Sequence, residues 1–234
     1  MRSATTAVCS PTSKEIAVPS SKLSLYHVTR PPRAGGAGPH PTILLLHGRG
    51  ADELDLLSLA RELDPRLYVV SARAPMATGP GHHWYHLEAL GKPEQRSFDA
   101  SLTALARFVA ELPTAYPVNP AAIFTLGFSQ GAMMAGSLLL TRPTSIAGTI
   151  MLSGYLPLAS GLPIDEAALT GRPVFEAHGS LDNVLPIALG HQARDYWQAV
   201  GVELTYREYP IAHSISAPEL DDLDEWLGPR LGKE

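Results

Sequence analysis

Ser129 is the serine best placed to act as a nucleophile, because it stands in the pentapeptide GFSQG over residues 127–131. An apolar run over residues 123–128 precedes it, and small residues such as Ala132 and Gly136 follow it at helical spacing. A reactive serine of this type needs a sharp turn between a strand and a helix, where small flanking residues let the strained backbone pass close to its neighbours. A helix-capping serine in a tight turn is the alternative interpretation. The flanking pattern favours the nucleophile.

A base must lie within hydrogen-bond reach of that serine, and an acid must orient the base. Where the nucleophile stands in a G-x-S-x-G turn, the acid and then the histidine follow the serine along the chain. The histidines after Ser129 are His178, His191 and His213. His178 ends an apolar strand and His191 falls inside an expected helix, whereas His213 lies in a loop between the last expected strand and the last expected helix. We therefore assign the base to His213.

The acid that best fits this order is Asp182, which lies in a loop directly after an apolar strand over residues 173–177. Asp165 precedes that strand, Asp195 falls in the middle of an expected helix, and Asp221 follows the base. These competitors therefore have the wrong context or the wrong order. An aspartate that only forms a turn is the alternative interpretation of Asp182.

Acyl transfer also needs hydrogen-bond donors for the negative charge that develops on the substrate oxygen. Two backbone N–H groups serve this purpose, one directly after the nucleophile and one from an early loop. The first is that of Gln130, and we expect the second from Arg49, in a glycine-rich turn over residues 47–52. His47 precedes the serine in the chain, so we expect it to bond backbone near this oxyanion hole rather than to act as the base.

Unbroken apolar runs predict the strands that carry these groups, because strands buried on both faces of a parallel sheet appear as continuous hydrophobic segments. The runs cover residues 42–46, 67–70, 123–128, 146–152 and 173–177. Leu23 and Leu25 alternate with polar residues over residues 22–28, which predicts a half-buried strand at an edge of the sheet. Ser129 and Asp182 both follow the end of an apolar run.

Helical patterns lie between these runs. The clearest is an apolar stripe after a candidate cap at Ser97, formed by Phe98, Leu102, Leu105, Val109 and Leu112. A second helix is expected over residues 187–200, and a last one follows Ser216 and Glu219, which have capping-box spacing. The alternation predicts a single α/β domain with a mostly parallel twisted sheet, helices on both faces and no large cap domain. Ligands of such a fold bind at the carboxyl ends of the strands.

Composition excludes several classes of protein. Of the 234 residues, 45% are hydrophobic and only 18% are charged, which argues against a disordered chain. The formal net charge is −5 without any basic run, so we expect no nucleic-acid partner. A membrane span needs about 18 consecutive apolar residues, and the sequence has none. We expect a flexible segment over residues 1–20, one domain over residues 21–234 and, without the apolar core of a secretory signal, a cytoplasmic location.

The segment over residues 74–95 is long for a connector, so we expect it to form a partial cover over the site. We expect Trp84 and Tyr85, together with Tyr155, to form a wall of an acyl pocket and to bind substrate. Aromatic side chains that only pack against the domain are the alternative interpretation.

Three histidines of the same segment suggest a metal site at first sight, namely His82, His83 and His86. A zinc site in proteins usually adds cysteine or carboxylate ligands in a characteristic pattern, and none is present nearby. We therefore expect no metal and no cofactor, and interpret these histidines as part of a solvated loop.

Residues 40–228 resemble the carboxylesterase, phospholipase and acyl-protein thioesterase branch of the α/β-hydrolases. The motifs that carry the resemblance occur in order as LLLHGRGAD, GFSQGAMMA, LSGYLP, HGSLDNVLP and AHSIS. The resemblance implies Ser129 as nucleophile, Asp182 and His213 as its partners, and the N–H groups of Arg49 and Gln130 as the oxyanion hole. Close relatives often have glycine and valine where this chain has alanine at 212 and leucine at 185, and neither side chain takes part in the chemistry.

The sequence thus predicts a serine carboxylesterase that hydrolyses short- to medium-chain carboxylic esters through an acyl-serine intermediate. An acyl-protein thioesterase or a lysophospholipase is the enzymatic alternative, and a hydrolase-fold protein that binds a small ligand without turnover is the non-enzymatic one. The expected partner is a small ester or thioester substrate. We expect no stable membrane association, and the sequence leaves open whether the protein forms a homodimer.

Overall fold

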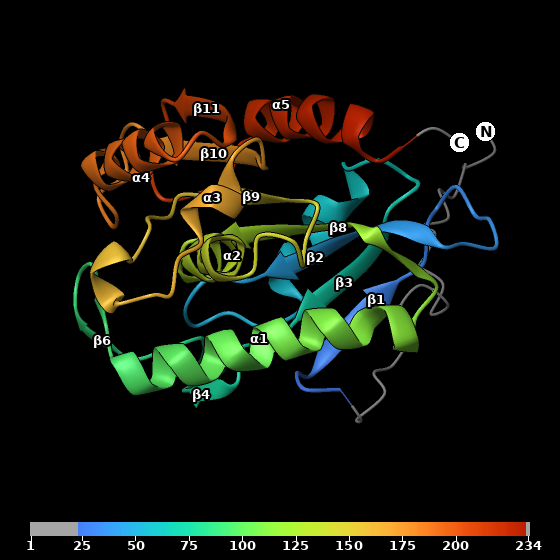
Figure 1. Cartoon of the computed structure of the whole chain (residues 1–234), viewed down its shortest axis with the longest axis horizontal. Coiled ribbons are helices and arrows are strands. Elements are labelled where there is room, and N and C mark those ends of the chain that lie inside the picture. Colours follow the sequence, from blue (N-terminus) through green and yellow to red (C-terminus); the bar gives the residue numbers. More distant parts are fainter. Residues whose placement is uncertain (1–22, 233–234) are drawn as a thin grey trace, which may run out of the picture.

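A seven-stranded sheet forms the centre of the computed structural model, which describes residues 23–232 (Figure 1). Its strands are β1 (His27–Arg30), β2 (His40–Leu46), β3 (Tyr68–Ala72), β8 (Val118–Phe128), β9 (Gly148–Leu152), β10 (Pro173–Gly179) and β11 (Glu203–Tyr209). The prediction of a flexible segment over residues 1–20 lies outside the described residues. The five apolar runs of the sequence correspond to β2, β3, β8, β9 and β10.

The strand order is β1-β3-β2-β8-β9-β10-β11, and every neighbouring pair is parallel except β1 with β3. This confirms the mostly parallel sheet. Leu44 and Leu45 show why the runs are continuous: both are fully buried, yet they belong to the cores on opposite faces of the sheet. A strand covered on both faces must be apolar at successive positions.

The edge strand begins later than predicted. The alternating segment over residues 22–28 was expected to pair with the sheet, but pairing with β3 starts only at His27. Before it, Ser24 donates its backbone N–H and its hydroxyl to the Glu111 carboxylate, at 2.7 and 2.8 Å. Leu23 and Leu25 pack on the core that contains Leu44, on one face of the sheet. Their alternation therefore reflects docking against a helix rather than strand pairing.

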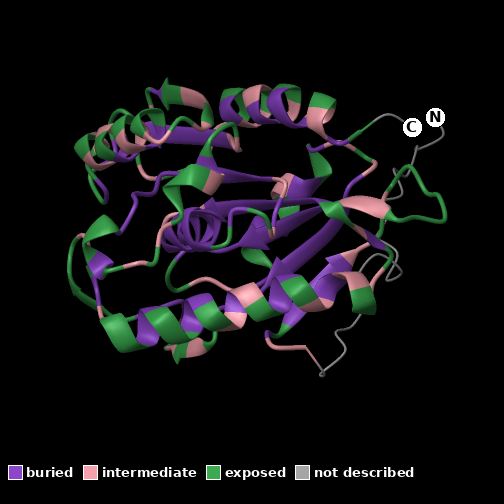
Figure 2. Cartoon of the chain, in the orientation of Figure 1, coloured by how far each residue is buried: buried purple, intermediate pink, exposed green. Residues whose placement is uncertain are grey.

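Helices cover both faces of the sheet. Their bounds are α1 (Gln95–Ala115), α2 (Gln130–Thr141), α3 (Glu166–Leu169), α4 (Ile187–Ala199) and α5 (Ala217–Leu227), with short 3₁₀ turns η1 (Asp55–Arg61), η2 (Leu158–Ser160) and η3 (Gly228–Arg230). Buried residues of α1, α2 and α4 pack on one face, and those of α5 and η1 pack on the other. Figure 2 shows the resulting pattern, in which the central strands and the inner sides of the helices are buried, whereas the edge strand β11 is largely exposed or half-buried.

The two predicted helix caps have different outcomes. Ser216 and Glu219 form the expected capping box at the start of α5. Ser97, however, lies inside α1, and the cap is Glu94, whose carboxylate accepts hydrogen bonds from the N–H groups of Arg96 and Ser97. A glutamate side chain is long enough to reach those groups, and its charge also favours the positive end of the helix.

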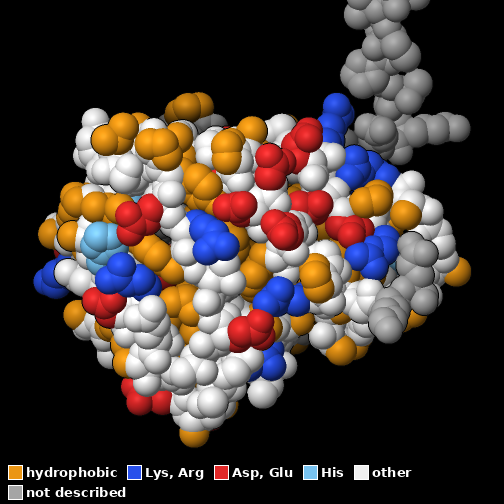
Figure 3. All heavy atoms as spheres, turned by 90° about the horizontal axis from the view of Figure 1, so that it is seen from above, with side chains coloured by type: hydrophobic (Ala, Val, Ile, Leu, Met, Phe, Trp, Pro, Cys, Tyr) orange, Lys and Arg blue, Asp and Glu red, His pale blue; other side chains and the backbone are white. Residues whose placement is uncertain are grey.

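Positive and negative side chains are mixed on the surface of the protein that Figure 3 shows. On the face shown in Figure 3, Lys and Arg side chains are interspersed with Asp and Glu, so this face has no continuous basic patch. Among residues 23–232, no helix has the length and apolar character needed to cross a membrane.

Candidate functional site

The nucleophile elbow is built by close backbone packing around Ser129, which connects β8 to α2. Ser129 has φ 53° and ψ −119°, a positive φ that a residue with a side chain rarely adopts. A Cβ on Gly131 would lie 1.9 Å from the Leu46 carbonyl oxygen, and one on Gly127 would lie 2.2 Å from the Gly131 carbonyl oxygen. Glycine is therefore required on both sides of the serine, as the sequence pattern indicated.

The three predicted members of the triad meet at hydrogen-bond distance. His213 Nε2 lies 2.9 Å from Ser129 Oγ, and His213 Nδ1 lies 2.7 Å from Asp182 Oδ2. Although the three residues are far apart in sequence, each follows the carboxyl end of a parallel strand, namely β8, β10 or β11. Because these ends meet at one edge of the sheet, the fold brings the side chains together.

Asp182 is held ionised in a buried position. Its Oδ1 accepts hydrogen bonds from the N–H groups of Val184 and Leu185 at 2.9 and 2.8 Å, which leaves Oδ2 for His213. Burial opposes ionisation of this carboxyl, but these hydrogen bonds outweigh it and hold the pKa of Asp182 below its usual value. Asp182 is therefore a fixed carboxylate that accepts a hydrogen bond from the Nδ1–H group of His213.

The loops that carry the acid and the base are bonded to each other. The backbone N–H groups of Ser180 and Leu181 donate to the carbonyl oxygens of Tyr209 and Ile211, at 2.7 and 3.0 Å. A Cβ on Gly179 would lie only 2.4 Å from the Ile211 oxygen, so the close approach depends on glycine. Since both loops are tied near their strand ends, the separation of the acid from the base is set by the sheet.

The glycine-rich turn after β2 lies against the elbow. A Cβ on Gly48 would be 3.5 Å from the Cβ of Ser129, which places the turn beside the nucleophile. Among the hydrogen bonds of the described residues, none uses the backbone N–H of Arg49 or of Gln130. These are the two donors that the sequence predicted, and they remain available for a ligand.

His47 has a fixed tautomer, and among the described residues its ring has no hydrogen bond to the triad. Its Nδ1–H donates to the Gly48 carbonyl at 2.7 Å, and its Nε2 accepts the N–H of Ala74 at 3.0 Å. Burial is the main cause that lowers the pKa of His47 and keeps the ring neutral. The expectation that His47 bonds backbone next to the turn is confirmed.

The three aromatic residues that we expected to bind substrate are buried. Trp84 and Tyr85 have no exposed surface, and Tyr155 is 3% exposed. The indole N–H of Trp84 donates to the His47 carbonyl at 2.9 Å, and the Tyr85 hydroxyl bonds the Met133 sulfur. These side chains form part of the core next to the site, and their contact with an acyl chain stays a prediction.

The other candidate bases and acids lie elsewhere. His178 Nε2 bonds the Leu185 carbonyl at 2.8 Å and lies 3.6 Å from Asp182 Oδ2, so it supports the acid loop. His191 pairs with Glu208 at the surface. Asp165 caps α3. None of these three competitors is hydrogen-bonded to the nucleophile among the described residues.

The histidines over residues 82–86 form a pair rather than a cluster. His83 Nε2 and His86 Nδ1 are 3.1 Å apart. Within the described part of the chain, no three His, Cys, Asp or Glu side chains are grouped closely enough to hold a metal ion. The segment itself forms two short hairpins, β4 (Met76–Thr78) with β5 (Gly81–His83) and β6 (Leu87–Ala89) with β7 (Lys92–Pro93).

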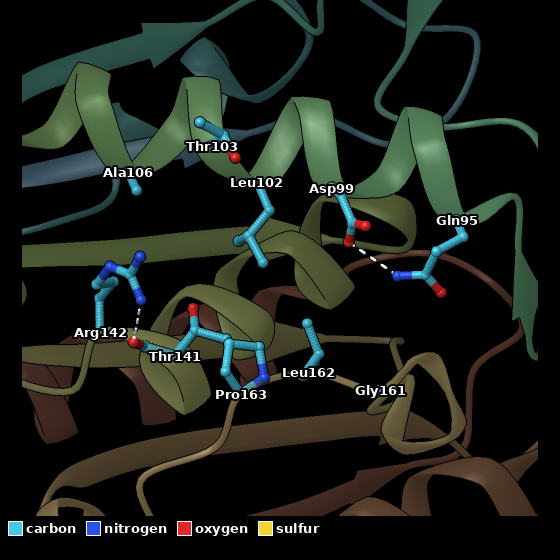
Figure 4. A pocket seen from close by; sticks show the side chains of 10 residues that line it. All are labelled: Gln95, Asp99, Leu102, Thr103, Ala106, Thr141, Arg142, Gly161, Leu162 and Pro163. Carbon is cyan, nitrogen blue, oxygen red and sulfur yellow. Dashed lines mark hydrogen bonds between the residues drawn. The ribbon is translucent and has the colours of Figure 1, made fainter.

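A hollow lies between α1, the end of α2 and the segment around residue 162, and Figure 4 shows the side chains that line it. Its volume is about 430 Å³. Leu102, Leu162 and Pro163 form its apolar part, and Asp99 and Arg142 contribute charges. It borders the carboxyl end of α2, whereas Ser129 lies at the opposite end of that helix. The hollow is thus separate from the triad.

Known proteins with a related sequence or fold include esterases and thioesterases. The chain is 28% identical to a probable carboxylesterase SOBER1-like of Arabidopsis thaliana over 63% of this chain, and it spans only 59% of the length of that relative. It is 28% identical to acyl-protein thioesterase 1 of Debaryomyces hansenii, over 64% of this chain and 68% of that one. The carboxylesterase of Bacillus cereus has a similar structure, with a TM-score of 0.81, 25% identity and coverage of 90% of this chain and 96% of that one.

A model of one protein family matches most of the chain. The family is described as Phospholipase/Carboxylesterase, and the match covers residues 33–229. The matched range contains the elbow, the acid loop, the base loop and the turn after β2. The fold is that of its esterase neighbours, with the predicted single domain and a mostly parallel sheet. This chain belongs to the phospholipase/carboxylesterase family of α/β-hydrolases.

Proposed function

We propose that the protein is a serine carboxylesterase that hydrolyses short- to medium-chain esters through an acyl-serine intermediate. The observation that carries this proposal is the alignment of Ser129, His213 and Asp182 through contacts of 2.9 and 2.7 Å. A serine hydroxyl is a weak nucleophile until a base within such a distance accepts its proton. Membership of the family supports the same function.

Two half-reactions follow from this geometry. Ser129 Oγ attacks the ester carbonyl carbon while His213 Nε2 takes the hydroxyl proton. The carbonyl oxygen becomes an oxyanion, which accepts hydrogen bonds from the backbone N–H groups of Arg49 and Gln130. Collapse of the tetrahedral intermediate expels the alcohol, which receives the proton from His213. Water then repeats the sequence with His213 as base, and the carboxylic acid leaves Ser129.

The thioester alternative is supported by the relative named acyl-protein thioesterase 1. The same triad can cleave a thioester, because the thiolate that leaves accepts the proton of the base in the same way as an alkoxide. We propose a small-molecule ester or thioester as the substrate, a cytoplasmic location and no stable membrane association.

A substrate series separates these alternatives. Rates with nitrophenyl esters of increasing chain length should be compared with rates for one acyl-thioester and one lysophospholipid, with Ser129→Ala as the control. A carboxylesterase should be fastest with short or medium nitrophenyl esters, and the control should abolish every rate. A kcat/KM at least tenfold higher for the thioester or the lysophospholipid would select that alternative. Undiminished turnover by Ser129→Ala would contradict the proposed function as a whole.

A further inference from the structure

Residues 81–86, here called the clamp segment, bond directly to the glycine-rich turn after β2. The Gly50 N–H donates to the His82 carbonyl at 2.7 Å, and the His82 N–H donates to the Ala51 carbonyl at 2.8 Å. The pair of bonds forms an isolated antiparallel bridge. It immobilises the residues that directly follow Arg49, whose N–H is one proposed donor of the oxyanion hole.

Two further contacts join the clamp segment to the same turn. A Cβ on Gly81 would lie 1.9 Å from the Gly50 carbonyl oxygen, so the chains approach as closely as glycine permits. On the other side of Arg49, the indole N–H of Trp84 donates to the His47 carbonyl at 2.9 Å. The turn is therefore held both before and after the proposed donor.

The clamp segment also holds the second donor. The side chain of Gln130 is inserted into it: Oε1 accepts the Trp84 backbone N–H at 2.7 Å, and Nε2 donates to the Tyr85 carbonyl at 2.8 Å. Gln130 is only 3% exposed, so these bonds are shielded from water. Gln130 is also the residue whose backbone N–H directly follows the nucleophile. Through the side chain of Gln130, the clamp segment therefore supports the second donor as well as the first.

The clamp segment is itself tied to α1. The Ser101 hydroxyl donates to the Trp84 carbonyl, and the His86 N–H donates to Ser97 Oγ at 3.1 Å. The Tyr85 ring also packs edge-on against Phe98, with 5.2 Å between ring centroids. The buried side of the long helix α1 thus fixes the clamp segment, which in turn contacts both halves of the proposed hole.

We propose that the clamp segment and the side chain of Gln130 are positioning elements that set the separation of the two oxyanion-hole donors. The inference rests on the proposed function, because it assigns a task to groups around the same site. Donors stabilise a transition state only if they are held in place before the charge develops. A displacement of about 1 Å in such a site can cost about 100-fold in rate.

Two substitutions test this role, one on each side of the contact. Trp84→Phe removes the bond to the His47 carbonyl and keeps an aromatic ring, while Gln130→Met removes both amide bonds and keeps a similar volume. Trp197→Phe is the matched control, because Trp197 is also fully buried but its indole N–H has no hydrogen-bond partner among the described residues. Thermal unfolding should verify that each variant is folded.

The measurements are kcat, KM and the affinity for a trifluoromethyl ketone, whose adduct with Ser129 carries an oxyanion. Both clamp variants should lose about 10- to 100-fold in kcat and in affinity for the ketone, with KM within about twofold. Trp197→Phe should keep all three values near wild type. If Gln130→Met does not fold, the comparison of the two tryptophan variants still decides.

Two outcomes separate this inference from the function on which it rests. An active wild type, an inactive Ser129→Ala and a Trp84→Phe that matches Trp197→Phe in kcat and ketone affinity would overturn the positioning role and leave the esterase intact. A wild type without turnover on any ester or thioester would instead overturn the proposed function.

Discussion

Ser129 has a backbone conformation that is unfavourable for any residue with a Cβ, and the surrounding glycines keep it there. Such strain costs on the order of 1–3 kcal/mol and persists only when neighbouring structure enforces it. Here the enforcing contacts come from β2, since Gly131 packs on the Leu46 carbonyl. The elbow therefore exposes the hydroxyl at the expense of stability.

This strain predicts how substitutions at the nucleophile change stability. Ser129→Ala keeps the Cβ and the strain, whereas Ser129→Gly removes both, because glycine adopts positive φ readily. The glycine variant should therefore be more stable than the alanine variant, by up to about 2 kcal/mol. Chemical denaturation of the two inactive variants measures the difference. A glycine variant less stable than the alanine variant would show that the elbow is not strained.

Asp182→Asn should lower kcat by roughly 10⁴ while leaving Ser129 in place. The amide oxygen can keep the N–H bonds of Val184 and Leu185, which directs the NH₂ group at His213 Nδ1. The base then carries its proton on Nε2 and cannot accept the serine proton. Steady-state rates of the folded variant provide the measurement. Near wild-type turnover would transfer the role of the acid to another carboxylate.

At the scale of elements, the features that could be predicted from the sequence are those that depend on burial or on neighbouring residues. The strands before Ser129 and Asp182 were predicted because both faces are covered, and the capping box of α5 because it uses neighbouring residues. The hairpins over residues 76–93 were not predicted, since strands of two or three residues carry no hydrophobic period. The contacts that we propose to support the oxyanion hole were not predicted either, because bonds such as that from His82 to Ala51 join segments that no sequence pattern connects.

Glu176 in β10 should make stability fall as pH rises. Burial raises the pKa of this carboxyl well above its usual value, against the opposing effect of the Arg194 charge. The unfolded chain ionises near pH 4.5 while the folded protein keeps the proton, so the contribution to stability is full below that pH and is lost as pH rises through the folded pKa. Glu176→Gln should therefore gain in Tm over wild type as pH increases from 5 to 8.

An exposed position supplies the control for this titration. Glu225→Gln makes the same chemical change on the exposed surface of α5, and we expect its Tm to stay close to that of wild type. If the advantage of Glu176→Gln does not change between pH 5 and pH 8, Glu176 is not the buried neutral acid that the structure indicates.

At the scale of the whole molecule, the segment over residues 74–95, which we expected to cover the site, lacks the means to dock at an oil surface. Interfacial enzymes need a sizeable apolar lid or an amphipathic surface helix. Residues 76–93 form two small hairpins instead, and the net charge of −5 disfavours anionic lipid surfaces. We therefore predict ordinary saturation by dissolved esters, with no jump in rate when tributyrin passes its solubility limit. A several-fold rise with the first emulsion droplets would favour the phospholipase alternative.

The identity of the nucleophile is tested most directly by mapping the residue that a fluorophosphonate modifies. The contacts of Ser129 with His213 predict one labelled peptide, which contains residue 129, and loss of both labelling and turnover in Ser129→Ala. Removal of a triad nucleophile typically costs on the order of 10⁶ in kcat, so residual activity should be barely measurable. Stoichiometric labelling of any other residue, with turnover retained in Ser129→Ala, would contradict the account.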